Sequence, residues 1–462
     1  MTTNSPPPHH RWARRQLLKS AALIGGAGAL LRGTSAAAQD HAHHTAPATP
    51  TPTPRAVSVG PMTMNRKTVA ASVTPPRPPK LVPGTDRPAT ITLNGGTLPF
   101  VMKDGVKEFH LTAHEFEQEF CPGFKVKVWG YNGSSPGPTI EAVEGDRVRI
   151  LVTNKLPEPT SVHWHGVLLP SGMDGVSGLS APPIPPGETW AYEFTLRQHG
   201  TQMYHPHFDE MVQMAVGMMG MFVIHPRDAA IGQVDRDYTM MLHAWAIHPG
   251  TSRPDPAVML EHDTWTINGR VFPAVEHLVV KTGQRVRLRI GNVSMHEHPM
   301  HIHGHHMWVT GTDGGMIPEG ARWPETTIQV PVGSTRTVEF VADNPGDWAF
   351  HCHKTHHAMN TMGHDIPNFL GVSQGEVAQR LGAQLPGYMP MGQGGMGDMG
   401  QMAGMMPGPA NTPPMMTGTG PYGGLDMGGM VTVIKVRDEV AADYRDPGWY
   451  KAPKGTMAWK VG

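Results

Sequence analysis

The chain has 462 residues, of which 16% are charged, and its formal net charge is -1. This length allows two or three domains, and the near-neutral balance offers no basic surface for nucleic acid. Among the residue counts, Gly 55, Pro 46, Met 32 and His 28 are unusual. Glycine and proline suit short strands joined by turns, whereas histidine and methionine are metal-binding residue types. Two cysteines exclude a disulfide framework.

The beginning of the chain has the features of an export signal. Arg14 and Arg15 precede the apolar run SAALIGGAGALL, which is too short to span a bilayer. A small-residue stretch then fits cleavage before Gln39. The pattern is similar to a bacterial twin-arginine signal, although Ala13 stands where Ser or Thr is usual. We therefore expect residues 1–38 to direct the protein to the periplasm, and the mature chain to have no membrane span.

An internal repeat follows. The segments NGSSPGPTIEAVEGDRVRILVTN (132–154) and NGRVFPAVEHLVVKTGQRVRLRIGN (268–292) both open with Asn-Gly and close with a G-x-R-V-R strand. The segments GTQMYHPH (200–207) and GDWAFHCH (346–353) repeat in the same order. Alternating strands and Gly/Pro turns in both copies indicate two homologous β-rich domains.

The domain boundaries are predicted from this repeat and from composition. Residues 39–88 are rich in Pro, Thr, Ala and His, which predicts an extended or disordered linker. The two domains are expected at 89–226 and 227–440, followed by a tail at 441–462. Residues 363–429 break the pattern with a short helical stretch and a Gly/Pro/Met-rich stretch, before the strand MVTVIKVRD returns. We expect them to be an insertion between the last two strands of domain two.

The repeat places four His-x-His pairs at related positions. On a strand, residues i and i+2 point to the same face, so each pair can offer two imidazoles to one metal cluster. Eight imidazoles suit a cluster of three borderline metal ions, with room for an exogenous molecule. The pairs are His163/His165, His205/His207, His301/His303 and His351/His353.

Cys352 lies between two of these histidines, so its side chain points to the opposite face of their strand. The residues that can join it there are His298, His357 and Met362. Two histidines, one cysteine and a weak axial methionine make a blue-copper electron-transfer site. Domain one has Pro206 in place of the cysteine and Thr160 in place of His298, so we expect no such site there.

These motifs resemble those of the multicopper oxidases. HWHG, HPH, HPMHIHG and HCHKTHHAMNTM match the family's four copper motifs, and the resemblance covers about residues 90–440. It implies an all-β fold of two tandem cupredoxin-like Greek-key β-barrel domains. It also implies four coppers per functional site, and one-electron oxidation of a small-molecule donor coupled to reduction of O₂ to water.

The resemblance further implies a role for each copper ligand. The type 1 set would be His298, Cys352, His357 and Met362. The type 2 ligands would be His163 and His301. One type 3 copper would be held by His165, His205 and His353, and the other by His207, His303 and His351.

Two cupredoxin repeats with the blue site only in the second are similar to the two-domain laccases. That similarity implies a homotrimer, in which each trinuclear cluster forms where domain one of one subunit meets domain two of the next. O₂ reduction also consumes protons, so an acid is expected near the cluster. Asp174 lies where several members of the family carry such a carboxylate, and a turn Asp before Gly175 is an equally good interpretation. Some members place a Glu directly after the second type 1 histidine, where this chain has Ala358.

The Met-rich insertion suggests the donor. It begins one residue after Met362, and thioethers are soft ligands that prefer Cu(I). It resembles the Met-rich segments of oxidases that serve copper tolerance, so Cu(I) is the favoured donor. The alternatives are a laccase-type phenol oxidase with this segment as a disordered cover, a copper-storage protein, and a two-domain nitrite reductase. A storage protein would not need the cysteine-linked pairs, and a nitrite reductase would not need eight cluster histidines.

Overall fold

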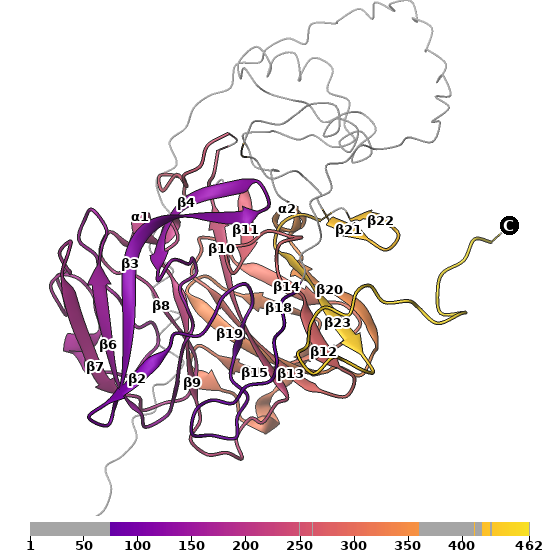
Figure 1. Ribbon diagram of the computed structural model, residues 1–462, viewed down its shortest axis with the longest axis horizontal. Helices are drawn as coiled ribbons and strands as arrows, with labels where there is room; N and C mark the ends of the chain where they lie inside the picture. Colours follow the sequence, from indigo (N-terminus) through magenta and orange to yellow (C-terminus); the bar gives the residue numbers. More distant parts are fainter. Residues whose placement is uncertain are drawn as a thin grey trace, which may run out of the picture. The chain divides into compact units, whose positions relative to one another are not determined.

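The computed structural model describes residues 74–461, apart from 249, 261, 360–410, 412–417 and 426. Most of the expected signal and linker, and most of the Met-rich insertion, therefore lie outside the described residues. Within the described part, strands greatly outnumber helices, which confirms the all-β prediction (Figure 1). No helix in this part is long and apolar enough to cross a membrane.

The strands between residues 100 and 225 form two sheets. One sheet has the order β2-β3-β6-β7, with β4 also pairing to β3, and the other has the order β5-β9-β8. Along β6 the buried and less buried positions alternate, as the period of a half-buried strand requires. The bounds are β2 Phe100–Lys103, β3 Val106–Cys121, β4 Phe124–Tyr131, β5 Ile140–Val143, β6 Arg147–Asn154, β7 Thr189–Thr195, β8 Gly200–Tyr204 and β9 Gly220–His225, with helices η1 Ser171–Met173 and α1 Glu210–Ala215.

The later strands form two larger sheets and a short hairpin of β21 and β22. An eight-stranded sheet runs β1-β10-β13-β19-β15-β16, with β11 on β10 and β17 on β15, and a five-stranded sheet runs β12-β23-β20-β14-β18. The bounds are β1 Ile91–Thr92, β10 Arg236–Trp245, β11 Thr264–Ile267, β12 Leu278–Lys281, β13 Arg285–Asn292, β14 His298–Ile302, β15 Met307–Thr312, β16 Gly315–Met316, β17 Trp323–Glu325, β18 Thr327–Val330, β19 Ser334–Val341, β20 Gly346–Cys352, β21 Gly418–Gly420, β22 Gly423–Leu425 and β23 Val431–Arg437, with helices η2 Glu319–Ala321 and α2 Thr355–Ala358.

Two segments cross the expected domain boundaries. β1 falls in the range expected for domain one, but it pairs in parallel with β10 of the eight-stranded sheet. Residues 74–88, expected to be linker, contain no helix or strand but are held in place. Arg77 pairs with Glu276 at 2.8 Å, and Arg87 is buried and donates to the backbone carbonyl of Ile231. The folded part therefore begins before the predicted boundary.

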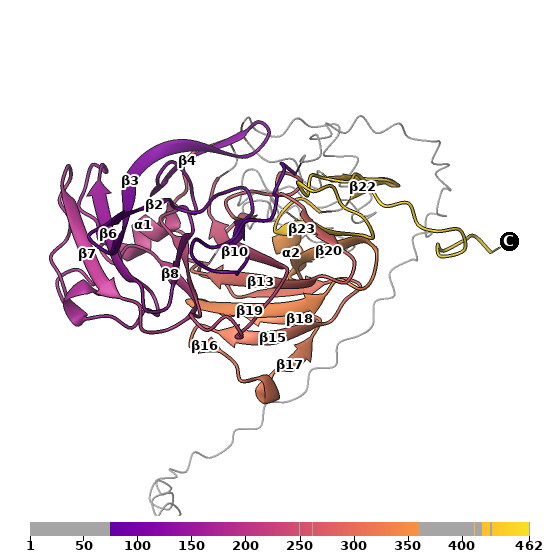
Figure 2. The ribbon, with the colours of Figure 1, turned by 60° about the horizontal axis from the view of Figure 1, so that its bottom comes forward.

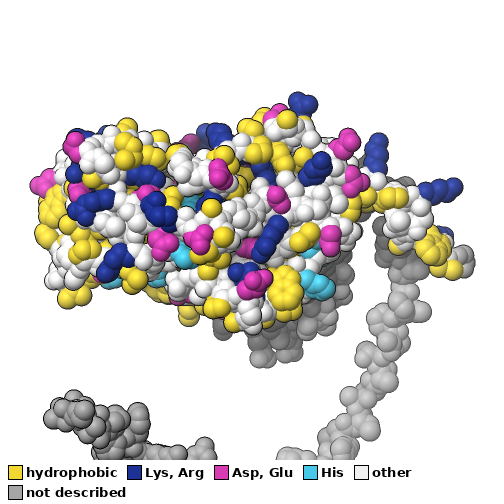
Figure 3. All heavy atoms as spheres, turned by 90° about the horizontal axis from the view of Figure 1, so that it is seen from below, with side chains coloured by type: hydrophobic (Ala, Val, Ile, Leu, Met, Phe, Trp, Pro, Cys, Tyr) yellow, Lys and Arg dark blue, Asp and Glu magenta, His cyan; other side chains and the backbone are white. Residues whose placement is uncertain are grey.

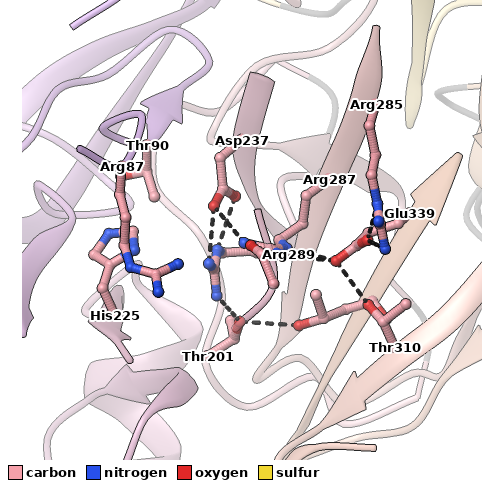
Figure 4. A network of polar contacts seen from close by, with 12 residues as sticks. Arg87, Thr90, Thr201, His225, Asp237, Arg285, Arg287, Arg289, Thr310 and Glu339 are labelled. Carbon is pink, nitrogen blue, oxygen red and sulfur yellow. Dashed lines mark hydrogen bonds and ion pairs between the residues drawn. The ribbon is translucent and has the colours of Figure 1, made fainter. Parts of the chain in front are cut away.

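A buried group of charges connects the two sets of sheets (Figure 4). Asp237 of β10 accepts hydrogen bonds from Arg287 and Arg289 of β13, and Arg287 also pairs with Glu339 of β19. Arg289 donates to the hydroxyl of Thr201 in β8 over 2.9 Å. Burial alone would raise the pKa of Asp237, but the two arginines lower it, so the carboxylate stays charged. Arg287 and Arg289 on the polar face of β13 can therefore be buried, because both guanidinium groups are paired with carboxylates.

The surface shows a different charge pattern. On the face in Figure 3, acidic and basic side chains are interspersed with apolar ones rather than gathered into a field of one sign. Each set of sheets has a large apolar core of its own, and smaller apolar clusters, such as that of Met203, Met221 and Met241, join the two sets. Phe109, Ile150 and Trp164 belong to the core of the first set, and Leu288, Val338 and Phe350 to that of the second. Figure 2 shows the strands of the second set stacked in layers beside the first set.

Candidate metal centre

Two neighbouring strands, β14 and β20, bring four of the predicted histidines together. Their antiparallel register places His301 opposite His351 and Met300 opposite Cys352. The Nε2 atoms of His303 and His351 are 3.1 Å apart, and the rings of His301 and His351 are 5.7 Å apart. A cavity of about 360 Å³ opens beside His301 and His303. These three histidines and His353, whose ring is 5.3 Å from that of His301, form the second quartet.

Backbone carbonyls orient two rings of this quartet. The Nδ1 of His301 donates to the carbonyl of Thr326 over 2.8 Å, and the Nδ1 of His351 donates to that of Cys352 over 2.9 Å. Each of these Nε2 atoms then keeps a lone pair for a metal ion. Burial, followed by the nearby His301 and His353, lowers the pKa of His303, which favours the neutral form that binds metals.

The first quartet consists of His163, His165, His205 and His207. The backbones of His163 and His205 pair in both directions, at 2.7 and 3.2 Å. The Nδ1 of His165 lies 3.2 Å from the Nε2 of His205, and the ring of His163 lies 5.6 Å from that of His207. Ligand atoms of the first three residues all lie within 4.8 Å of one another, close enough to hold one metal ion.

Hydrogen bonds and burial prepare this quartet in the same way. The Nδ1 of His163 donates to the carbonyl of Asp174 over 2.9 Å, and the Nδ1 of His205 donates to that of Pro206 over 2.9 Å. Burial lowers the pKa of His205 to about 3, so this imidazole is neutral at any physiological pH. Burial also lowers the pKa of His165, so these two residues offer neutral nitrogen donors, as a metal ion requires.

Two carboxylates lie beside the first quartet. The Oδ1 of Asp174, the acid predicted from sequence, is 3.4 Å from the Nδ1 of His163. Glu210, at the start of α1, was not predicted: its Oε2 is 3.5 Å from the Nε2 of His207, and its Oε1 is 3.8 Å from the Nδ1 of His205. No sequence signal identifies Glu210, because it becomes relevant only when α1 folds back toward the preceding strand.

The two quartets remain separate within one chain. Ring contacts and hydrogen bonds join members of each quartet. Among the described residues, which include all eight histidines, no such contact joins one quartet to the other. The eight imidazoles therefore form two half-sites of four.

A third group lies on the opposite face of β20. His298, Cys352 and His357 are completely buried. The Sγ of Cys352 is 3.8 Å from the Nδ1 of His298 and 3.5 Å from the Nδ1 of His357, and these two nitrogens are 3.1 Å apart. Burial raises the pKa of the Cys352 thiol to about 12 and lowers the pKa of both histidines. The fourth predicted ligand, Met362, lies outside the described residues.

Two residues that were not predicted support this group. The ring of Trp265 stacks on that of His357, with centroids 4.7 Å apart. The Nε2 of His298 lies 3.0 Å from the hydroxyl of Ser294, which bonds onward to the side chain of Asn292 over 2.8 Å. Such outer contacts fix the orientation of a ligating ring. The Nε2 of His357 is buried without a hydrogen-bond partner.

The donor set fits copper. Two nitrogens bound to one ion at about 2.0–2.1 Å lie roughly 3 Å apart, as the facing nitrogens do here. Two histidines and a cysteine suit a blue-copper ion. Two family models, both described as multicopper oxidase, match residues 112–229 and 249–368, together just over half of the chain.

The chain belongs to the multicopper oxidases. Copper is therefore its cofactor. Copper resistance protein A of Escherichia coli is 42% identical over 114 residues, which cover 25% of this chain and 18% of that protein. Laccase-1 of Cryptococcus neoformans var. grubii is 33% identical over 229 residues, covering 42% of this chain and 36% of that protein. The matches thus span well under half of these relatives.

Solved structures of multicopper oxidases share this architecture. The blue copper oxidase from Nitrosomonas europaea superposes with a TM-score of 0.54 at 25% identity, covering 71% of this chain and 85% of that one. The likeness confirms the prediction of tandem cupredoxin-like domains. In this multicopper oxidase, His298, Cys352 and His357 would hold the type 1 copper, and the two quartets would hold the type 2 and type 3 coppers.

Proposed function

We propose that this multicopper oxidase takes electrons one at a time from a donor at the type 1 copper and uses four of them to reduce O₂ to water at a trinuclear cluster. One observation carries this: β20 presents Cys352 to the type 1 set on one face, and the flanking His351 and His353 to the second quartet on the other. Bound copper supplies the one-electron chemistry. The covalent backbone of three consecutive residues links the two sites.

The remaining residues orient, enclose and supply protons. Carbonyls of Asp174, Thr326 and Cys352 hold the rings so that the Nε2 atoms converge. Complete burial keeps water from the thiol of Cys352, and Trp265 stacks on the neighbouring ring of His357. We assign Asp174, 3.4 Å from the ring of His163, as the proton donor to the cluster, and Glu210 is a second carboxylate, 3.5 Å from the ring of His207.

We further propose that the active form is a homotrimer. Each chain provides two half-sites that do not meet, so a complete cluster needs the first quartet of one subunit and the second quartet of its neighbour. A head-to-tail interface of this kind generates a closed ring when the rotation between neighbouring subunits closes. We also propose that the twin-arginine signal expected in residues 1–38 directs the enzyme to the periplasm.

We propose Cu(I) as the favoured donor and copper tolerance as the role, with phenol oxidation as the alternative. The Met-rich stretch and the likeness to a copper resistance protein support the first, and the likeness to a laccase supports the second. The test is steady-state oxidation of Cu(I) and of a phenol by the full chain and by a variant lacking residues 388–429.

Deletion should raise the KM for Cu(I), because thioethers that recruit the ion are removed, while phenol oxidation continues as fast or faster. Unchanged Cu(I) kinetics with a collapse of phenol oxidation would instead make the segment a wall of the phenol site. Copper content and O₂ uptake, measured on the same preparations, separate an oxidase from a storage protein and from a nitrite reductase.

A further inference from the structure

Four pairs of histidine rings in the described residues face each other nitrogen to nitrogen. Three of these contacts join members of the copper motifs and measure 3.1–3.2 Å. The fourth joins the Nδ1 of His262 to the Nε2 of His296 over 2.9 Å. Neither His262 nor His296 belongs to a ligand set assigned above. The fourth pair therefore has the geometry of the other three without an assigned role.

The position of this pair relates it to the type 1 site. His262 lies just before β11, and His296 lies in the connection from β13 to β14, two residues before His298. The ring of His296 is 5.6 Å from that of His357, with an interplanar angle of 78°. His357 is itself completely buried. The pair is thus next to a type 1 ligand.

The residues around the pair are partly exposed to solvent. His262 is 6% exposed, whereas His296 is half-buried. Leu260 and Met295, each adjacent or nearly adjacent to one member of the pair, are 73% and 53% exposed. Met295, next to His296 in the chain, is therefore an exposed residue with a soft thioether. Two acidic residues adjoin the pair in the chain, and both are engaged elsewhere: Glu297 pairs with Lys354, and Asp263 accepts hydrogen bonds from the backbone of Ile247 and the hydroxyl of Thr264.

We propose that His262 and His296 form a further copper site, distinct from the four cofactor coppers, which takes Cu(I) and holds it beside His357. Two imidazole nitrogens and an exposed thioether suit a soft monovalent ion. An ion held there gives up one electron, which passes by way of His357 to the oxidised type 1 copper, and the ion leaves as Cu(II). Four such turnovers supply the four electrons that O₂ consumes with four protons. The inference rests on the proposed use of Cu(I) as donor.

The experiment uses the copper-loaded full chain and two single variants, His262→Gln and His296→Gln. The matched control is His110→Gln, on β3, whose side chain is 62% exposed. Cu(I) binding is measured without O₂ by competition with a chromogenic Cu(I) chelator. Oxidation of Cu(I) and of a phenol is then measured in air, and the blue absorption band confirms that each variant retains its type 1 copper.

Each variant should bind one Cu(I) fewer than the wild type. Loss of a single outer partner of a metal ligand costs roughly 10–100-fold in affinity, so loss of a direct ligand should raise the KM for Cu(I) by at least about tenfold. Phenol oxidation by the variants should stay within about twofold of the wild type, and the control should match the wild type throughout.

The outcomes separate this site from the wider function. If the variants bind and oxidise Cu(I) as the wild type does, the His262–His296 site is wrong, while the proposed function stands. If the wild type does not oxidise Cu(I), yet loses one bound Cu(I) on either substitution, the site stands as a binding site and the choice of donor is wrong. Equal losses for Cu(I) and phenol with a weakened blue band would show that the pair only supports the type 1 ligands, and would overturn the proposal.

Discussion

The two halves of the molecule place different pairs of side chains at the same buried position. In each half, a short helix follows a histidine-rich strand end: α1 after His207 and α2 after His353. In the second half, His298 faces His357, at the third residue of α2, across 3.1 Å. In the first half, Thr160, the counterpart of His298, donates to Gln213 in α1 over 2.7 Å. Both members of both pairs are completely buried.

The difference lies in which pair is complete without a metal ion. The hydroxyl of Thr160 and the amide of Gln213 satisfy each other, and the amide also donates to the carbonyl of Pro159. The second pair adds the thiol of Cys352 and leaves the buried Nε2 of His357 without a partner. The Nδ1 atoms of His298 and His357 and the Sγ of Cys352 converge on one point, where a copper ion would bind. One half therefore has a buried pair closed by a hydrogen bond, and the other has a buried ligand set for copper.

The largest effect should follow from Cys352→Ser. A hydroxyl is a poor ligand for a soft metal ion, so the blue band and donor oxidation should both be lost, with one copper fewer per chain. The histidine quartets should keep their coppers. Absorption spectra, metal analysis and O₂ uptake provide the measurements. The control is Cys121→Ser, which alters the only other cysteine, buried in a separate apolar cluster. A full-strength blue band in Cys352→Ser would contradict the assignment.

A second prediction combines one half from each of two damaged chains. One variant carries His163→Ala and His165→Ala, and the other carries His301→Ala and His303→Ala. Neither should take up O₂ alone. Differently tagged and co-expressed, they should form mixed trimers with about a third of the wild-type O₂ uptake, because one of three head-to-tail interfaces joins two intact quartets. Light scattering should give a trimer in each case. No recovery in purified mixed trimers would place the cluster within single chains.

The smallest effect concerns the half without a type 1 site. Thr160→Val keeps the shape of the side chain but leaves the buried Oε1 of Gln213 without its donor, which should lower the free energy of unfolding by about 1–3 kcal/mol. Chemical denaturation measures this change. The blue band and the KM for the donor should not move. A loss of blue colour would mean that this buried pair is coupled to the type 1 site of the second half.

The grouping of the histidine pairs and Cys352 was predictable because strand alternation is a local signal, whereas the copper role of each residue came from the resemblance to the multicopper oxidases. Alternation along β20 puts His351 and His353 on one face and Cys352 on the other, and the repeat carries the same argument to His163 and His205. The all-β fold could be predicted for a related reason, since strand alternation and turn residues are local signals.

Contacts between distant segments could not be predicted. Trp265 stacks on His357 from a strand more than ninety residues earlier, and nothing in its own neighbourhood marks it. The role of Glu210 depends on how α1 folds back. Alternation along β13 places Arg287 and Arg289 on one face, but their burial depends on Asp237, which meets them from β10.

That buried charge group also bears on ring closure. A head-to-tail interface closes after three copies only when the two binding faces of one subunit differ by a fixed rotation. In the proposed trimer those faces carry the two quartets, and the angle between them is set by how the first set of sheets meets the second. Asp237, Arg289 and Thr201 form part of that junction, with the acid and the arginine at most 5% exposed. In the proposed trimer, this junction, whose residues lie away from the copper ligands, would thus help to set whether three subunits form a closed ring or an open chain.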